Sequence, residues 1–73
     1  MSIGMASELQ VAFGEHVRDR RVSLKLTQTE LADKLGIQQS TLSDIENGRH
    51  APTLETVEKL AKALKTTAQA LLS

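Results

Sequence analysis

The 73-residue sequence contains no cysteine, tryptophan or tyrosine, and only one phenylalanine and one proline. Without cysteine, disulfide scaffolds and cysteine metal sites are excluded. The near absence of aromatic residues requires an aliphatic core, and the scarcity of proline favours helices. No apolar run is long enough to span a membrane, and the N-terminus does not resemble a signal peptide. We therefore expect a cytoplasmic protein of one domain with no membrane partner.

Net charge is also lacking, because nine basic and nine acidic residues give a formal charge of zero. A nucleic-acid partner would therefore have to be bound by a local basic patch. One such patch is present, since Arg18, Arg20, Arg21 and Lys25 lie in a short window in which Asp19 is the single acid.

The spacing of apolar residues predicts five short helices in one all-α domain over residues 7–73, preceded by a flexible end at residues 1–6. The first helix is expected to begin near Ser7, with Leu9, Phe13 and Val17 on its buried face. That face continues to Arg21. Because a buried unpaired charge is costly, Arg21 needs a partner.

Capping residues predict where the other helices begin and end. Thr27 and Glu30 fit a capping box at the start of the second helix, and Gly36 is expected to end it. The third helix is expected over residues 39–47, before Gly48. Threonines are expected to cap the fourth and fifth helices. The side chains expected to face the core from these helices are Leu31, Ala32, Leu35, Ile37, Leu42, Ile45, Leu54, Val57, Leu60, Ala61, Leu64, Ala68, Leu71 and Leu72.

Residues 28–47 have the spacing of a helix-turn-helix, with small Ala32 where the two helices approach and Gly36 in the turn between them. The second helix of such a unit enters the major groove of DNA. The segments "LTQTELADKLGI" and "STLSDIENGRHAPTLETVEKLAKAL", with the basic first helix, resemble the Cro/C1-type (XRE-like) helix-turn-helix family over about residues 14–72. The resemblance implies a lambda-repressor-like five-helix fold and a homodimer that binds double-stranded DNA at a near-palindromic operator.

The same resemblance implies roles for individual residues. Gln39, which opens the third helix, is the expected base-reading residue, suited to adenine, and Ser40 and Ser43 are further candidates. Gln28 is expected to bind a phosphate and to brace Gln39, and Arg21 and Glu46 match a structural ion pair. The candidates for phosphate contact are Gln28, Thr27, Asn47 and Arg49, joined by Arg18 and Arg20 from the basic patch.

The sequence departs from this family at several positions. Asp44 is expected to face the groove, where a carboxylate can accept from cytosine, reject sites that offer only acceptors, or pair with a base of its own chain. Lys25 and Lys65 stand where glycine is usual, so these helix ends either keep a positive φ at some cost or are built differently. Gln38 replaces a better helix cap.

We therefore expect a sequence-specific DNA-binding transcriptional regulator that acts as a repressor. Two other classes of function compete with this expectation. Catalysis and metal or cofactor binding are not expected, because His16 and His50 lack acidic partners at ligand spacing and no histidine lies near the serines of the third helix. A protein-interaction module, such as an antitoxin that masks a toxin with weak or no DNA binding, remains the alternative. Leu71 and Leu72 are the candidate dimer contacts, unless they only close the core.

Overall fold

The computed structural model describes residues 7–73, which form five helices and no strand. The helices are α1 (Glu8–Ser23), α2 (Gln28–Leu35), α3 (Gln39–Glu46), α4 (Leu54–Ala63) and α5 (Ala68–Leu72). The predicted all-α, five-helix fold is confirmed. The flexible end predicted at residues 1–6 lies outside the described residues.

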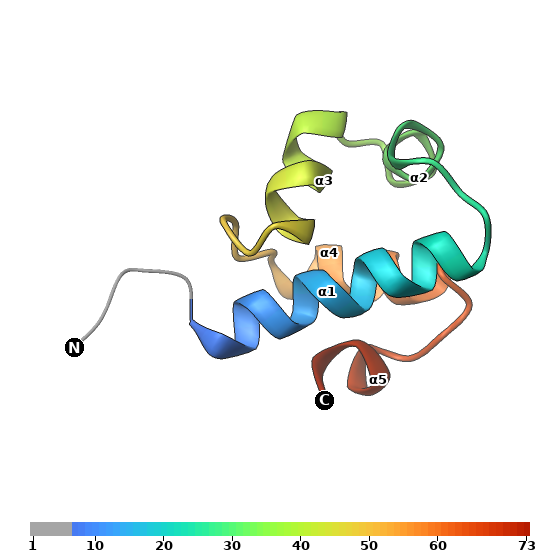
Figure 1. The fold of residues 1–73 in the computed structure, drawn as a ribbon. Coiled ribbons are helices and arrows are strands. Elements are labelled where there is room, and N and C mark those ends of the chain that lie inside the picture. Colours follow the sequence, from blue (N-terminus) through green and yellow to red (C-terminus); the bar gives the residue numbers. More distant parts are fainter. Residues whose placement is uncertain (1–6) are drawn as a thin grey trace.

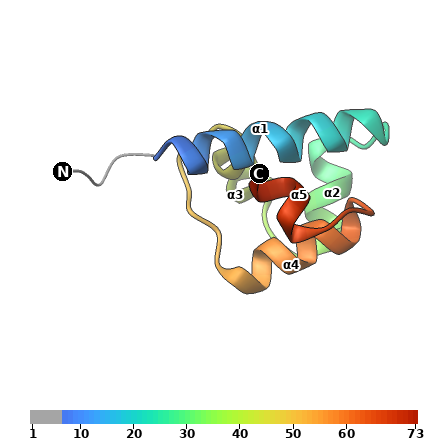
Figure 2. The same ribbon diagram turned by 90° about the horizontal axis from the view of Figure 1, so that it is seen from below.

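The long helix α1 separates the other helices, with α2 and α3 on one side of it and α5 on another (Figure 1). It packs against α3 and α5, while α2 packs against α3 and α4. Seen from below, α5 lies between α1 and α4 (Figure 2). The helix-turn-helix pair α2 and α3 is therefore supported from two directions, by α1 and by α4.

The core is aliphatic apart from Phe13, as the composition requires. Leu31 of α2, Leu42 of α3 and Leu60 of α4 are fully buried members of one core cluster. Burying one leucine side chain contributes roughly 1.5–3 kcal/mol. The other hydrophobic core residues are Phe13, Val17, Ala32, Leu35, Ile45, Val57, Ala61, Leu64 and Leu71.

Four of the five helices begin at a hydroxyl side chain that caps the first turn. Ser7, Thr27, Thr53 and Thr67 each accept a hydrogen bond from the backbone N–H three residues later. At α2 the cap is reciprocal, because the Glu30 carboxylate also accepts from the Thr27 N–H at 2.8 Å. Gln38 makes no side-chain cap. Its backbone carbonyl accepts from the Thr41 N–H at 3.1 Å, but no cap side chain accepts from the first turn of α3.

Helices α1 to α4 all end in the same way. A residue with positive φ follows the last turn, and the N–H after it bonds back to a carbonyl five residues earlier. The φ angle is 70° at Gly36 and 75° at Gly48, but the corresponding residues after α1 and α4 are Lys25 (61°) and Lys65 (58°). The return bonds are Leu26 to Arg21, Ile37 to Ala32, Arg49 to Asp44 and Thr66 to Ala61. Both lysines therefore keep the glycine conformation.

We expect Lys25→Gly to raise the free energy of unfolding by about 1 kcal/mol, because glycine adopts this φ without the steric cost that a side chain carries. Chemical denaturation of the variant measures the gain. Lys34→Gly, in the last turn of α2 where the backbone is still helical, is the control and should have the opposite sign. An unchanged midpoint for Lys25→Gly would show that the left-handed backbone at this position stores no strain.

Three leucines expected in the core are exposed instead, and one of them is Leu72 at the end of α5, with 37% exposure. Leu9 is 56% exposed and Leu54 is 80% exposed. Each lies in the first turn of its helix, at the edge of the core where no other helix covers it. Together with Leu72 and Pro52 they border an open apolar groove, whose floor includes Phe13. We call this surface the apolar groove.

Candidate nucleic-acid interface

The turn between α2 and α3 is short because Gly36 supplies a left-handed residue directly after α2. The Ile37 N–H then bonds to the Ala32 carbonyl at 3.1 Å and directs the chain into α3. Apart from the adjoining residues, no atom of residues 7–73 lies within 4 Å of a Cβ placed on Gly36, so only the positive φ requires glycine there. Ala32 is buried, as expected of a small residue between the two helices.

Helix α3 divides sharply into an inner and an outer face. Leu42, Ile45 and Glu46 are buried. Gln39 and Ser40 are exposed at its first turn, and Ser43 and Asp44 are half-buried further along. The four predicted base-reading residues therefore all lie outside the core, on one short helix.

The inner face of α3 rests directly on the backbone of α1 at Gly14. A Cβ added to Gly14 would overlap the carbonyl oxygens of Ile45 and Glu46, the second at 2.7 Å. Sequence reasoning missed this residue, since a glycine inside a helical pattern carries no sign of what approaches it. The sequence gives one indication of its role. Glycine is unfavourable in the interior of a helix, so its presence there indicates close packing against another element.

Glu46 is the one buried charged residue among residues 7–73, and Arg21 is its main partner. Arg21 donates from Nε to Glu46 Oε2 at 2.7 Å and from Nη2 to Oε1 at 3.1 Å. Its remaining nitrogen donates to the Leu26 carbonyl at 2.9 Å. The structure thus contains the ion pair that the position of Arg21 in the sequence required, and it ties α1 to α3.

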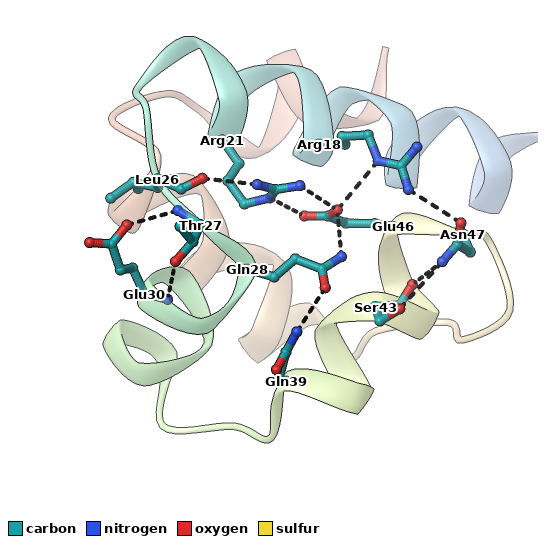
Figure 3. A network of polar contacts seen from close by, with 10 residues as sticks. All are labelled: Arg18, Arg21, Leu26, Thr27, Gln28, Glu30, Gln39, Ser43, Glu46 and Asn47. Carbon is teal, nitrogen blue, oxygen red and sulfur yellow. Dashed lines mark hydrogen bonds and ion pairs between the residues drawn. The ribbon is translucent and has the colours of Figure 1, made fainter.

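Two more side chains converge on the same carboxylate (Figure 3). Gln28 of α2 donates to Glu46 Oε1 at 3.0 Å, and Arg18 of α1 approaches the same oxygen at 3.5 Å. Glu46 therefore joins α1, α2 and α3 at one point. We call Arg18, Arg21, Gln28 and Glu46 the Glu46 cluster.

Opposing effects act on the pKa of Glu46. Burial raises it, but the hydrogen bonds from Arg21 and Gln28 and the charge of Arg21 outweigh burial, so the pKa lies below its ordinary value of 4.5. The carboxylate is therefore ionised at neutral pH and accepts from all of its partners.

The Glu46 cluster also orients the first residue of α3. A carboxylate can only accept, so Gln28 must turn its amide nitrogen toward Glu46 and its oxygen outward. Gln39 donates from Nε2 to that Gln28 oxygen at 3.3 Å (Figure 3). The Thr29 hydroxyl donates to Gln39 Oε1, also at 3.3 Å. Both ends of the Gln39 amide are thus fixed before any ligand arrives.

The residues expected at phosphates border α3 on two sides. Thr27 and Gln28 lie at the start of α2, and the Thr27 hydroxyl is used in the capping box. Asn47 follows α3, donates to the Ser43 carbonyl at 2.9 Å and accepts from Arg18 at 3.3 Å. Arg49 lies beyond Asn47 and bonds to Asp44.

Arg20 is placed differently from the expectation. Its guanidinium donates to the carbonyls of Leu64 and Lys65, each at 2.9 Å, and so completes the C-terminal end of α4. Successive residues of a helix point in different directions, so Arg20 faces α4 while Arg18 and Arg21 face α3. This geometry favours a structural role for Arg20.

The two leucines at the end of the chain also differ. Leu71 is buried in the core, and the His16 ring contacts its carbonyl at 2.7 Å. Leu72 is exposed at the border of the apolar groove. Leu71 therefore closes the core, and of the pair only Leu72 is accessible to a partner.

The described residues contain no group of three or more His, Cys, Asp or Glu side chains arranged to hold a metal ion. Within residues 7–73, no helix is both long and apolar enough to cross a membrane.

Comparisons with known proteins agree on this architecture. Residues 17–71 match the helix-turn-helix family model HTH_3. The transcriptional repressor RstR of cryptic phage CTXphi from Vibrio cholerae is 46% identical over 50 residues, which are 68% of this chain and 45% of RstR. The chain spans about half or less of the length of the first curated relatives that it matches.

Two crystal structures have the same fold. The restriction-modification controller protein C.AhdI of Aeromonas hydrophila is 32% identical, with a TM-score of 0.81 over 85% of this chain and 94% of that one. The biofilm regulator SinR, solved in complex with DNA, is 29% identical, with a TM-score of 0.79 over 84% of this chain and 98% of that one. Together with the family match, these likenesses show that this chain belongs to the Cro/C1-type (XRE-like) helix-turn-helix family.

Proposed function

We propose that this protein is a sequence-specific DNA-binding transcriptional regulator that inserts the outer face of α3 into the major groove. The observation that carries this proposal is the exposed Gln39, whose amide is held in one orientation by Gln28 and Thr29. A side chain fixed in this way loses little entropy when it meets a base.

The fixed amide leaves a defined set of free positions. Gln39 uses one Nε2 hydrogen on Gln28 and one oxygen lone pair on Thr29, so one donor and one acceptor remain. A neighbouring donor and acceptor match N7 and the N6 amino group of adenine. Ser40 and Ser43 lie beside this amide and are the next candidates to reach base edges.

Phosphate binding would be shared between neutral and charged groups. Thr27, Gln28 and Asn47 are neutral, and the second Nε2 hydrogen of Gln28 is free beside its bond to Glu46. The cations at this surface are Arg18 and Arg49, both of which already contact carboxylates. Two cations per protomer imply that the logarithm of affinity falls with the logarithm of salt concentration with a slope of about −2 per protomer.

A homodimer would supply the second half of the interface, because one domain of this size buries too little surface on DNA for tight specific binding. The apolar groove is the surface that fits a second copy, since Leu9, Leu54 and Leu72 are exposed around it. We place the homodimer contact there, with Leu72 in place of the buried Leu71. The relative RstR is named a transcriptional repressor, which supports repression of transcription, and not activation, as the role of this protein.

Selection of bound sequences from random double-stranded DNA tests this function. We expect an inverted repeat whose half-sites lie one helical turn apart, about 34 Å. Leu72→Glu should select a single half-site and sediment as a monomer with unchanged helicity. If no sequence is enriched and binding is absent at low salt, the protein is an interaction module, such as an antitoxin.

Gln39→Ala is expected to weaken binding to the selected operator by about 1–3 kcal/mol, because the bidentate contact to one base is lost. Thermal stability should change little, since the side chain is exposed. Gln69→Ala, an exposed glutamine of α5, is the matched control and should leave affinity unchanged. Equal affinity of Gln39→Ala and wild type would remove Gln39 from base readout.

A further inference from the structure

Asp44 and Arg49 form an ion pair at the end of α3, on the same side as the predicted base-reading residues. Arg49 donates from Nε at 3.3 Å and from Nη2 at 3.1 Å, and both bonds end on the single oxygen Oδ1 of Asp44. The helix end sets this geometry, because the Arg49 N–H also bonds to the Asp44 backbone carbonyl at 2.8 Å after the left-handed Gly48.

Folding does not explain this pair. The side chains are 47% exposed for Asp44 and 63% exposed for Arg49. Exposed ion pairs contribute little to stability because water screens both charges. A carboxylate close to DNA phosphates would weaken binding unless it were neutralised or given a donor.

We propose that Asp44 is a specificity-determining residue that selects cytosine in the major groove, and that Arg49 positions and neutralises it for this purpose. This inference rests on the proposed function. Arg49 occupies Oδ1, whereas Oδ2 accepts no hydrogen bond from any of residues 7–73. The free oxygen is an acceptor only, so it selects a base edge that offers a donor.

Cytosine is the base that fits this oxygen. Its major-groove edge presents the N4 amino group as a donor and no acceptor. Adenine also offers an amino group, but N7 beside it is an acceptor that repels a carboxylate. Guanine presents two acceptors, and thymine presents one and a methyl group. Discrimination by Asp44 therefore combines attraction to cytosine with rejection of the other bases.

The test is selection from random double-stranded DNA with wild type, Asp44→Ala, Asp44→Asn and Asp33→Ala. Asp33 is the matched control, because it is an exposed aspartate on α2 whose removal changes the net charge equally, and it lines the same open pocket as Lys59 and Lys62 of α4. Wild type and Asp33→Ala should prefer cytosine at one position of each half-site by about 5- to 150-fold over the other bases. Asp44→Ala should lose that preference there and keep the others. Asp44→Asn, whose amide both donates and accepts, should prefer a different base at that position.

A second experiment tests the role of Arg49 with the variant Arg49→Ala. It should weaken binding more in wild type than in Asp44→Ala, because only in wild type does it leave a carboxylate unneutralised beside the phosphates. Equal weakening in both backgrounds would contradict the positioning role of Arg49.

Uniformly tighter binding by Asp44→Ala, with an unchanged base preference, would overturn the specificity role and leave Asp44 as a repulsive charge. A wild-type selection without any enriched sequence would instead refute the proposed function itself.

Discussion

Replacing Gly14 with alanine is expected to lower the free energy of unfolding by about 3 kcal/mol, the upper part of the range for overpacking a core. The added methyl group would meet the carbonyl oxygens of Ile45 and Glu46. Backbone oxygens at the end of α3 cannot rotate away as a flexible side chain can, so α1 and α3 must move apart. For a domain of this size the loss corresponds to a fall in melting temperature of roughly 12–24 °C.

Thermal denaturation followed by circular dichroism measures this effect, with Glu15→Ala as the control. Glu15 directly follows Gly14 and is exposed on α1, so its replacement should change stability by less than about 0.5 kcal/mol. Helix propensity alone predicts the opposite sign, because alanine is favoured over glycine inside a helix by about 1 kcal/mol. A stabilised Gly14→Ala would therefore show that α1 and α3 are not in backbone contact.

Replacing Glu46 with alanine is expected to cost about 3–5 kcal/mol, since it leaves a largely buried Arg21 without its counter-charge. The side chain of Arg21 is only 13% exposed. The amide of Gln28 would lose its acceptor as well. Denaturant titration gives the loss, and binding to DNA should fall with it because Gln28 no longer has a fixed orientation.

The double replacement Arg21→Met with Glu46→Leu separates charge from packing. Because it removes both charges together, it should recover most of the stability that Glu46→Ala loses. DNA affinity should stay low in this variant, since Gln28 still lacks the acceptor that orients it. If the double variant is as unstable as Glu46→Ala, the cluster stabilises the fold by its shape and not by its charges.

Because the pKa of Glu46 is lowered, the stability that Glu46 provides should also depend on pH. Because the pKa of Glu46 is lower in the folded than in the unfolded protein, the ionised carboxylate stabilises the fold. This contribution is complete above the unfolded pKa, near 4.5, and is lost as the pH falls through the folded pKa. The free energy of unfolding should therefore fall on acidification below about pH 4.5. Glu46→Gln should flatten this dependence. The backbone N–H of Thr27 also lowers the pKa of Glu30, so Glu30→Gln is the control and should remove only a minor part of the slope.

Local chemistry made the helix starts predictable. The hydroxyl caps at Thr27, Thr53 and Thr67 depend only on residues three positions away, and the structure contains all three. The left-handed residues after α1 and α4 were harder to predict, because Lys25 and Lys65 are not glycines. The family resemblance identified these two positions, but it did not decide whether their backbone has a positive φ.

The residues that could not be predicted depend on distant partners. Helical periodicity identifies one face of a helix, but it does not reveal whether another element covers each turn of that face. Leu9 and Leu54 therefore have core spacing and yet are exposed. Arg20 meets carbonyls more than forty residues away, at the end of α4. Gly14 faces the backbone of α3, for which its own neighbours in sequence give no sign.

The division of α3 into an anchored face and an outer face has a consequence for how such a protein diversifies. Leu42, Ile45 and Glu46 fix the helix through the core, so substitutions at Gln39, Ser40 and Ser43 remove no core contact. Mutations on the outer face are therefore nearly neutral for folding. Under the proposed function, these outer residues can be replaced one at a time, so a new preference for a DNA sequence can arise by point mutation without loss of the fold.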